Sequence, residues 1–143
     1  MNADQLVTFI KSHLSGAEGW THPFHPLQAP LTSTAWDGDS FSTEAATLLD
    51  LSAVFGVPAG VKAVLVRLQT RDSAAWGTAD LYTSVGPSAT VFYEVTCRCF
   101  GGDVWNNALG ICACDANGDI YYRILASGAG TMDVYIQILG YWL

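Results

Sequence analysis

The four cysteines are the residues of this chain whose type and spacing could do chemistry. They form two pairs, Cys97-x-Cys99 and Cys112-x-Cys114, and residues two apart in a strand point to the same side of it. If the two strands pair antiparallel with Cys97 opposite Cys114, then Cys99 lies opposite Cys112.

Three interpretations of these thiols remain open. They are free thiols packed as small apolar side chains, cross-strand disulfides formed in an oxidising medium after release, or a four-thiolate zinc site. We favour free thiols, because a cytosolic origin keeps thiols reduced. Structural zinc sites also usually separate paired cysteines by about two to four residues rather than by one.

The histidines all lie near the start of the chain, at His13, His22 and His25. The pair His22-x-x-His25 could bind a metal where symmetric copies meet, but we favour a pair that is exposed or packs along the N-terminal segment. A Ser-His-Asp or Cys-His site would have to borrow a histidine from that segment. The sequence has no G-x-S-x-G, phosphate-loop or H-E-x-x-H motif, so we expect no catalytic residue and no enzymatic activity.

Two short acidic segments, 37–39 and 115–119, could offer oxygen ligands to calcium. The second segment lacks the glycine and the glutamate of an EF-hand loop, and its Asn117-Gly118 pair is typical of a tight turn. We therefore expect no metal site and no cofactor.

The segment Phe100–Leu109 is predicted to be a long connection between strands. It places an aromatic ring among short polar side chains, a combination that suits recognition of a sugar or a protein. The alternative is a tryptophan folded under the loop to seal the core. The candidate recognition residues are Asp103, Trp105, Asn106 and Asn107.

The elements that must position these residues fall into three zones. Residues 1–16 predict an amphipathic helix, residues 17–39 a proline-rich extended arm, and residues 40–143 a β-domain. A helix this short is marginal alone in water, so its apolar face must dock on its own domain, on a copy of itself or on another protein. The arm could reach another subunit or fold back on its own domain, and both remain open.

Residues 40–143 alternate between apolar and polar side chains over seven segments separated by turn signals. Seven or eight antiparallel strands in about 100 residues predict a β-sandwich or jelly roll. The predicted strands are Thr47–Val54, Val61–Thr70, Trp76–Val85, Val91–Cys99, Gly110–Asp115, Asp119–Ala126 and Thr131–Leu143.

The last residues of the chain, Ile138–Leu143, are nearly all apolar, whereas most chain ends fray. We expect them to form a central strand or to be buried against a neighbour. Together with the helix face they make the predicted assembly interface, which consists of Leu6, Phe9, Ile10, Leu14, Tyr141, Trp142 and Leu143.

The composition points to a protein whose surface is covered by partners. Half of the 143 residues are hydrophobic and 13% are charged, whereas ordinary soluble domains carry about 25% charged residues. A monomer coated by uncharged polar residues is the alternative. The net charge of −7 argues against nucleic acid and anionic membranes as partners. We see neither the pattern of a signal peptide nor an apolar run of about 18 residues, and expect a cytosolic origin and no membrane partner.

The plan of the whole chain resembles small bacteriophage virion proteins, although no motif in it is diagnostic. The resemblance rests on segments 35–43 and 50–63, on the helix and arm before them, and on the apolar end at 140–143. Head-decoration (cement) proteins and tail-fibre head domains have this plan and are commonly homotrimers. The resemblance implies a virion protein, assembled in the host cytoplasm, that clamps neighbouring subunits of the major capsid protein or contacts another virion protein. A fibre that binds a host surface glycan is the alternative, and a small enzyme with a site between subunits is a third.

Overall fold

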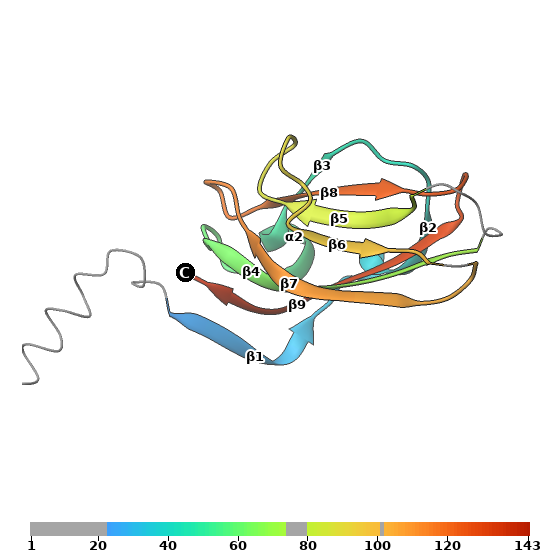
Figure 1. Ribbon diagram of the computed structural model, residues 1–143. Coiled ribbons are helices and arrows are strands. Elements are labelled where there is room, and N and C mark those ends of the chain that lie inside the picture. The colour runs from blue at the N-terminus through green and yellow to red at the C-terminus, as the bar shows by residue number, and fades with distance from the viewer. Residues whose placement is uncertain (1–22, 74–79, 101) are drawn as a thin grey trace, which may run out of the picture.

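The protein is described here by a computed structural model that covers residues 23–73, 80–100 and 102–143 (Figure 1). Within these residues the chain is mostly antiparallel β, with nine strands in two sheets. The strands are β1 (Phe24–Leu31), β2 (Asp37–Phe41), β3 (Thr47–Leu49), β4 (Ala63–Asp72), β5 (Tyr82–Gly86), β6 (Val95–Arg98), β7 (Asn106–Ala113), β8 (Ile120–Leu125) and β9 (Met132–Trp142). The helical elements are η1 (Thr34–Trp36) and α2 (Leu51–Phe55).

The first sheet has the order β1-β9-β4-β7, and β2 also pairs with β9. Phe24 lies opposite Trp142 at the end of β9, and Phe41 lies opposite Met132 at its start. β1 and β2 therefore form one interrupted edge strand along β9. The second sheet has the order β3-β8-β5-β6.

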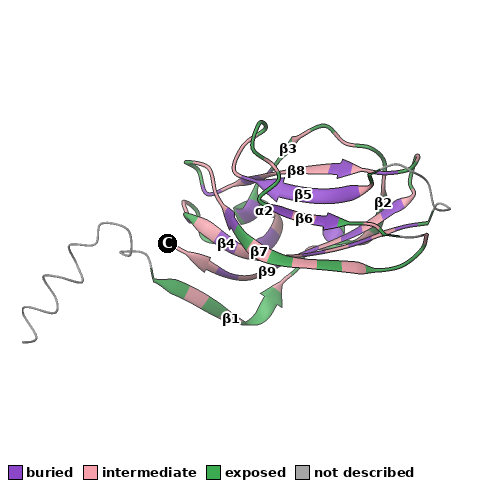
Figure 2. Ribbon diagram, viewed as in Figure 1, coloured by how far each residue is buried: buried purple, intermediate pink, exposed green. Residues whose placement is uncertain are grey.

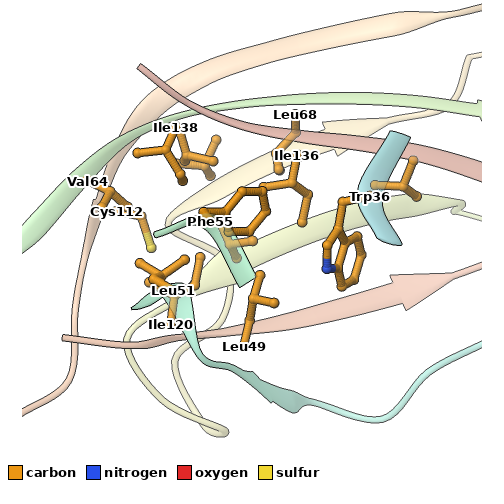
Figure 3. Packing of buried hydrophobic residues seen from close by; sticks show 14 of the residues in the cluster. Trp36, Leu49, Leu51, Phe55, Val64, Leu68, Cys112, Ile120, Ile136 and Ile138 are labelled. Atoms are coloured by element: carbon orange, nitrogen blue, oxygen red, sulfur yellow. The ribbon is translucent and has the colours of Figure 1, made fainter. Parts of the chain in front are cut away.

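The core lies between the two sheets because one face of each long strand is apolar (Figure 3). On β4 and β9 every second residue is buried, from Val64 to Asp72 and from Met132 to Ile138. The second sheet contributes Ile120 and Ile124. Each fully buried aliphatic side chain stabilises the fold by about 1.5–3 kcal/mol.

The prediction of a strand over Thr47–Val54 is wrong beyond Leu49, because helix α2 begins at Leu51. The carboxylate of Asp50 accepts a hydrogen bond from the N–H of Ala53 at 2.8 Å and caps α2. Gly56 ends the helix in the left-handed conformation, with its N–H directed at the carbonyls of Leu51 and Ser52. Local capping thus outweighs the β-propensity of this segment.

The described part of the N-terminal segment folds back on its own domain. Residues 24–41 pair with β9 of the same chain, so the expected boundary between residues 39 and 40 falls inside β2. The predicted helix over residues 1–16 and the arm up to residue 22 lie outside the described residues.

Residues 87–94, the connection between β5 and β6, fold over the outer face of the second sheet. A Cβ on Gly86 would lie 2.2 Å from the carbonyl oxygen of Val91, and the hydroxyls of Tyr82 and Tyr93 are 2.9 Å apart. The outward residues of β5, Tyr82, Ser84 and Gly86, are therefore buried like the inward ones. The predicted strand from Val91 accordingly begins only at Val95.

Candidate assembly surface

The outer face of the first sheet consists of the side chains that alternate with the buried ones and point away from the core. The pairing register brings Leu65 on β4 opposite Ile111 on β7 and Gly140 on β9. Figure 2 shows β7 alternating between exposed and intermediate residues and β1 mostly exposed. Among the described residues, both edges of this sheet, β1 and β7, therefore expose side chains on this face.

An apolar band crosses the outer face from β1 to β7, and we define it by Phe24, Leu65, Leu109, Ile111 and Trp142. Leu109 and Ile111 are 62% and 58% exposed. The rings of Phe24 and Trp142 lie 4.4 Å apart. Large apolar side chains that lie together and exposed mark an interaction site.

Gly140 allows the aromatic end of the band to lie flat on the sheet. A Cβ at this position would lie 2.4 Å from the ring of Phe24 and 2.9 Å from the carbonyl oxygen of His25. Because glycine has no side chain, the ring of Phe24 lies directly over the backbone of β9.

The other half of the outer face is polar and aromatic. Arg71 donates a hydrogen bond to Asp133 at 2.5 Å, and its guanidinium lies 4.9 Å from the ring of Trp105. The hydrogen bond to Asp133 raises the pKa of Arg71, so the arginine stays charged and paired. The rings of Trp105 and Tyr135 are 5.1 Å apart, and Arg67 donates to Gln137.

The predicted recognition residues divide between a loop and a strand. Asp103 has a φ of 58°, which aspartate tolerates, and its carboxylate lies 3.4 Å from Arg71. Asn106 and Asn107 begin β7, so the prediction of a connection reaching Leu109 is wrong. They pair with Thr70 and Gln69 and extend the β4 ladder, which outweighs the low strand propensity of asparagine. Trp105 lies on the outer face, neither at a loop tip nor under the core.

The predicted interface at the end of the chain falls partly on this surface. β9 lies between β4 and the interrupted edge strand, as a central strand should. Tyr141 packs on His25 with ring centroids 5.4 Å apart, Trp142 belongs to the apolar band, and Leu143 is exposed. The helix residues of the same predicted interface, Leu6, Phe9, Ile10 and Leu14, lie outside the described residues.

All four cysteines are free thiols, as we favoured, and the two strands that carry them do not pair with each other. β6 pairs with β5 and β7 pairs with β4, so Cys97 lies opposite Thr83 in one sheet and Cys112 opposite Val64 in the other. β6 and β7 are the edge strands of different sheets, and they approach each other closely where Gly110 faces Val95.

The thiols pack as side chains of the core. The hydroxyl of Thr70 lies 3.2 Å from the Sγ of Cys97 and 3.5 Å from that of Cys99. Burial raises the pKa of Cys97, Cys99 and Cys112, and it raises the pKa of Cys114 to about 12. Because the thiolate is the reactive form, such thiols are inert near neutral pH.

The acidic segment at 115–119 is a turn. The carboxylate of Asp115 accepts hydrogen bonds from the N–H groups of Asn117 and Asp119 at 2.8 and 3.0 Å. Asp119 in turn accepts the N–H of Leu51. In the described ranges no group of three or more histidine, cysteine or acidic residues gathers where it could hold a metal ion. In the same ranges no helix is long and apolar enough to span a membrane.

Sequence reasoning missed the aliphatic half of the apolar band, although β7 carries a signal for it. The inward positions of this strand hold small residues, Ala108 and Gly110, while the outward ones hold Leu109 and Ile111. A Cβ on Gly110 would lie 2.8 Å from the side chain of Val95 on β6, so the inward side has no room for large residues.

Comparisons of the chain with protein-family models, curated proteins and solved structures find no match.

Proposed function

We propose that this chain is a non-enzymatic structural protein of a bacteriophage virion, a homotrimeric head-decoration (cement) protein that clamps neighbouring capsid subunits. The observation that carries the proposal is the exposed apolar band on a chain of which only 13% is charged. Burying such a surface against neighbouring subunits stabilises an assembly by about 25 cal/mol for each Å² of apolar area. Its place is the virion, assembled in the host cytoplasm.

The strand order supports a jelly-roll β-sandwich as the fold. When β1 and β2 are counted as one interrupted strand, the chain has eight strands, and the two sheets have the orders 1-8-3-6 and 2-7-4-5. This is the strand order of a jelly roll, an architecture that viral capsid proteins and lectins share. Because one fold serves many functions, the fold agrees with the proposal and does not carry it.

The proposal is tested by binding of the full chain to phage heads that lack it. We expect the purified chain to sediment with such heads and to appear as added density at regular positions on the capsid surface. A chain that stays in the supernatant contradicts the proposal, and density confined to the tail favours the second function below.

A fibre protein that binds a host surface glycan is the second candidate. Trp105 favours it, because its ring is 36% exposed and lies beside Arg71, which also contacts the carboxylate of Asp103. Pockets that bind small ligands combine aromatic side chains with a few polar groups. This function predicts that Trp105→Ala lowers adsorption of the phage to host cells. Unchanged adsorption with a normal particle count excludes this role of Trp105.

A further inference from the structure

We infer that Arg123, on the outer face of the β3-β8-β5-β6 sheet, binds the carboxylate of an acidic sugar. This sheet lies across the core from the sheet that carries the apolar band (Figure 1). The inference therefore goes beyond the proposed function and does not depend on it. It rests on the hydrogen-bonding capacity of Arg123, on the aromatic side chains around it and on the shortage of acceptors on this face.

Three of the four arginines of the chain already direct their guanidinium groups at an acceptor. The edge formed by Nε and Nη2 is the one that forks onto a carboxylate, and in Arg67 and Arg71 it is occupied. The pairs are Arg67 with Gln137, Arg71 with Asp133 and Arg98 with Asp80.

Arg123 is the fourth arginine, and its Nε–Nη2 edge is free among the described residues. It follows Tyr122 and precedes Ile124, both packed in or against the core, so its own side chain points outward. Its Nη1 donates a hydrogen bond to the hydroxyl of Tyr93 at 3.2 Å. No ion pair within the described ranges includes it.

The covering connection, residues 87–94, fixes the position of this guanidinium. The guanidinium carbon of Arg123 lies 5.4 Å from the centre of the Phe92 ring. The hydroxyl of Tyr93 is held in turn by that of Tyr82, 2.9 Å away. Burial and this hydrogen bond raise the pKa of Tyr82 to about 12, so Tyr82 stays protonated. A cation positioned in this way binds an anion without first losing conformational freedom.

The surroundings of Arg123 are short of acceptors. Ser84 lies directly opposite it in the pairing of β5 with β8, is 0% exposed, and its Oγ has no hydrogen-bond partner in the part of the chain that the structure describes. Asp80 is paired with Arg98, and the carboxylate of Glu94 accepts the N–H of Ala113 on β7. An anionic ligand would supply the acceptors that this face does not provide.

The chemistry of the site favours a sugar with a single carboxylate. A planar carboxylate matches the fork of Nε and Nη2. The ring of Tyr93, beside Arg123, is 53% exposed and offers both an apolar face and a hydroxyl, as the C–H and O–H groups of a sugar ring require. The chain carries a net charge of −7, which disfavours a polyanion.

The experiment follows the backbone N–H signals of the isotope-labelled full chain by NMR during titration with glucuronate, a sugar with one carboxylate. We expect saturable shifts at residues 91–94 and at Arg123. The expected dissociation constant is about 1 mM, the strength of one sugar ring on an open surface. Glucose, which has the same ring without the carboxylate, should bind roughly 10-fold more weakly or less tightly still.

Two variants of Arg123 and one control separate its role from that of any surface arginine. Arg123→Gln removes the charge and the fork, and should weaken glucuronate binding roughly 10-fold or more. Arg123→Lys keeps the charge without the fork, so most of this loss should remain. Arg67→Gln is the matched control on the outer face of the other sheet, where Gln137 occupies the same edge, and it should bind glucuronate as wild type does.

The absence of a saturable shift at about ten times the expected dissociation constant overturns the inference, as does equal weakening by the Arg67 and Arg123 variants. Equal binding of glucuronate and glucose overturns the role of the carboxylate. Equal binding of glucuronate and N-acetyl-aspartate amide identifies an acidic protein side chain as the ligand and overturns the assignment to a sugar. If Arg123→Gln does not give the spectrum of a folded chain, Arg123→Lys replaces it.

Binding to phage heads is scored separately. A chain that binds glucuronate through Arg123 but ignores heads contradicts only the proposed function, and a chain that decorates heads but does not bind glucuronate contradicts only this inference.

Discussion

At the scale of single residues, Asp72 is a buried acidic side chain that joins two parts of the fold. It is 1% exposed and accepts hydrogen bonds from the N–H of Ser127 at 2.9 Å, the hydroxyl of Ser127 at 2.6 Å and the hydroxyl of Thr131 at 3.1 Å. A buried carboxylate is tolerated only with such partners. These bonds join the end of β4 to the connection between β8 and β9.

Replacement of Asp72 tests this role. Asp72→Ala leaves three donors without their acceptor, and we expect the free energy of unfolding to fall by about 3 kcal/mol. Urea denaturation measures the change. Asp80→Ala, which removes an exposed carboxylate paired with Arg98, is the control and should change the midpoint little. Equal effects of the two substitutions would show that Asp72 is not a structural residue.

The buried thiols predict how stability depends on pH. In the unfolded chain a thiol titrates near 8.5, whereas burial raises the pKa of Cys114 in the fold to about 12. Above pH 8.5 the unfolded chain therefore binds fewer protons than the folded one, and the free energy of unfolding falls as the pH rises. Below that pH both states are protonated and the full stability is present.

Urea denaturation under reducing conditions at pH 8, 9 and 10 checks this dependence. Each thiol contributes a slope of at most about 1.4 kcal/mol per pH unit, and partial exposure reduces the share of Cys114. Cys114→Ser should make the slope shallower, because serine does not titrate in this range. If wild type and variant have the same slope, the thiol is not shielded as described.

At the scale of elements, sequence periodicity identified the strands that have one buried and one open face. β4, β8 and β9 lie within two residues of their predicted bounds. Alternation with a period of two runs through all of β4 and through β9 from Met132 to Ile138, and turn residues mark both ends of β8. Periodicity failed for the elements whose type or bounds depend on capping or tertiary contacts. α2 depends on the cap of Asp50, and β6 is shortened because residues before Val95 cover β5.

Gly86 lies under residues 87–94, the connection between β5 and β6, so a substitution at this position tests how firmly the connection packs on the second sheet. Gly86→Ala would place a Cβ 2.2 Å from the carbonyl oxygen of Val91, so residues 87–94 must move away. We expect a loss of about 2 kcal/mol in the free energy of unfolding, as for overpacked cores. Gly128→Ala is the control, since its Cβ would meet Thr131 at 3.5 Å, an ordinary contact. Two equally stable variants would mean that the connection is loosely attached.

At the scale of the whole molecule, the sequence indicated a mostly antiparallel β-domain with two further apolar surfaces that a β-sandwich core does not need, the face of the N-terminal helix and the end of the chain. The end of β9 was one of them, and Trp142 belongs to the apolar band. The aliphatic half of the band was not predicted, because periodicity shows that a strand has two faces without showing which one points inward. For β7, the close approach of Gly110 to the side chain of Val95 determines which face points inward. That contact joins segments from different sheets.

The pairing of β1 and β2 with β9 predicts the result of a long N-terminal deletion. Removal of residues 1–39 takes away β1 and most of β2, so the edge of β9 loses its hydrogen-bond partners. We expect a lower urea midpoint and concentration-dependent light scattering, because an unpaired strand edge promotes aggregation. A deletion variant as stable and monodisperse as the full chain would show that β9 does not need this edge.

The pairing of Phe24 with Trp142 brings the beginning and the end of the described chain together at one corner of the first sheet (Figure 1). A fusion partner attached after Leu143 would therefore emerge close to Phe24. The β-domain is therefore suited to circular permutation, in which a short linker joins Leu143 to Pro23 and new ends open at an exposed turn.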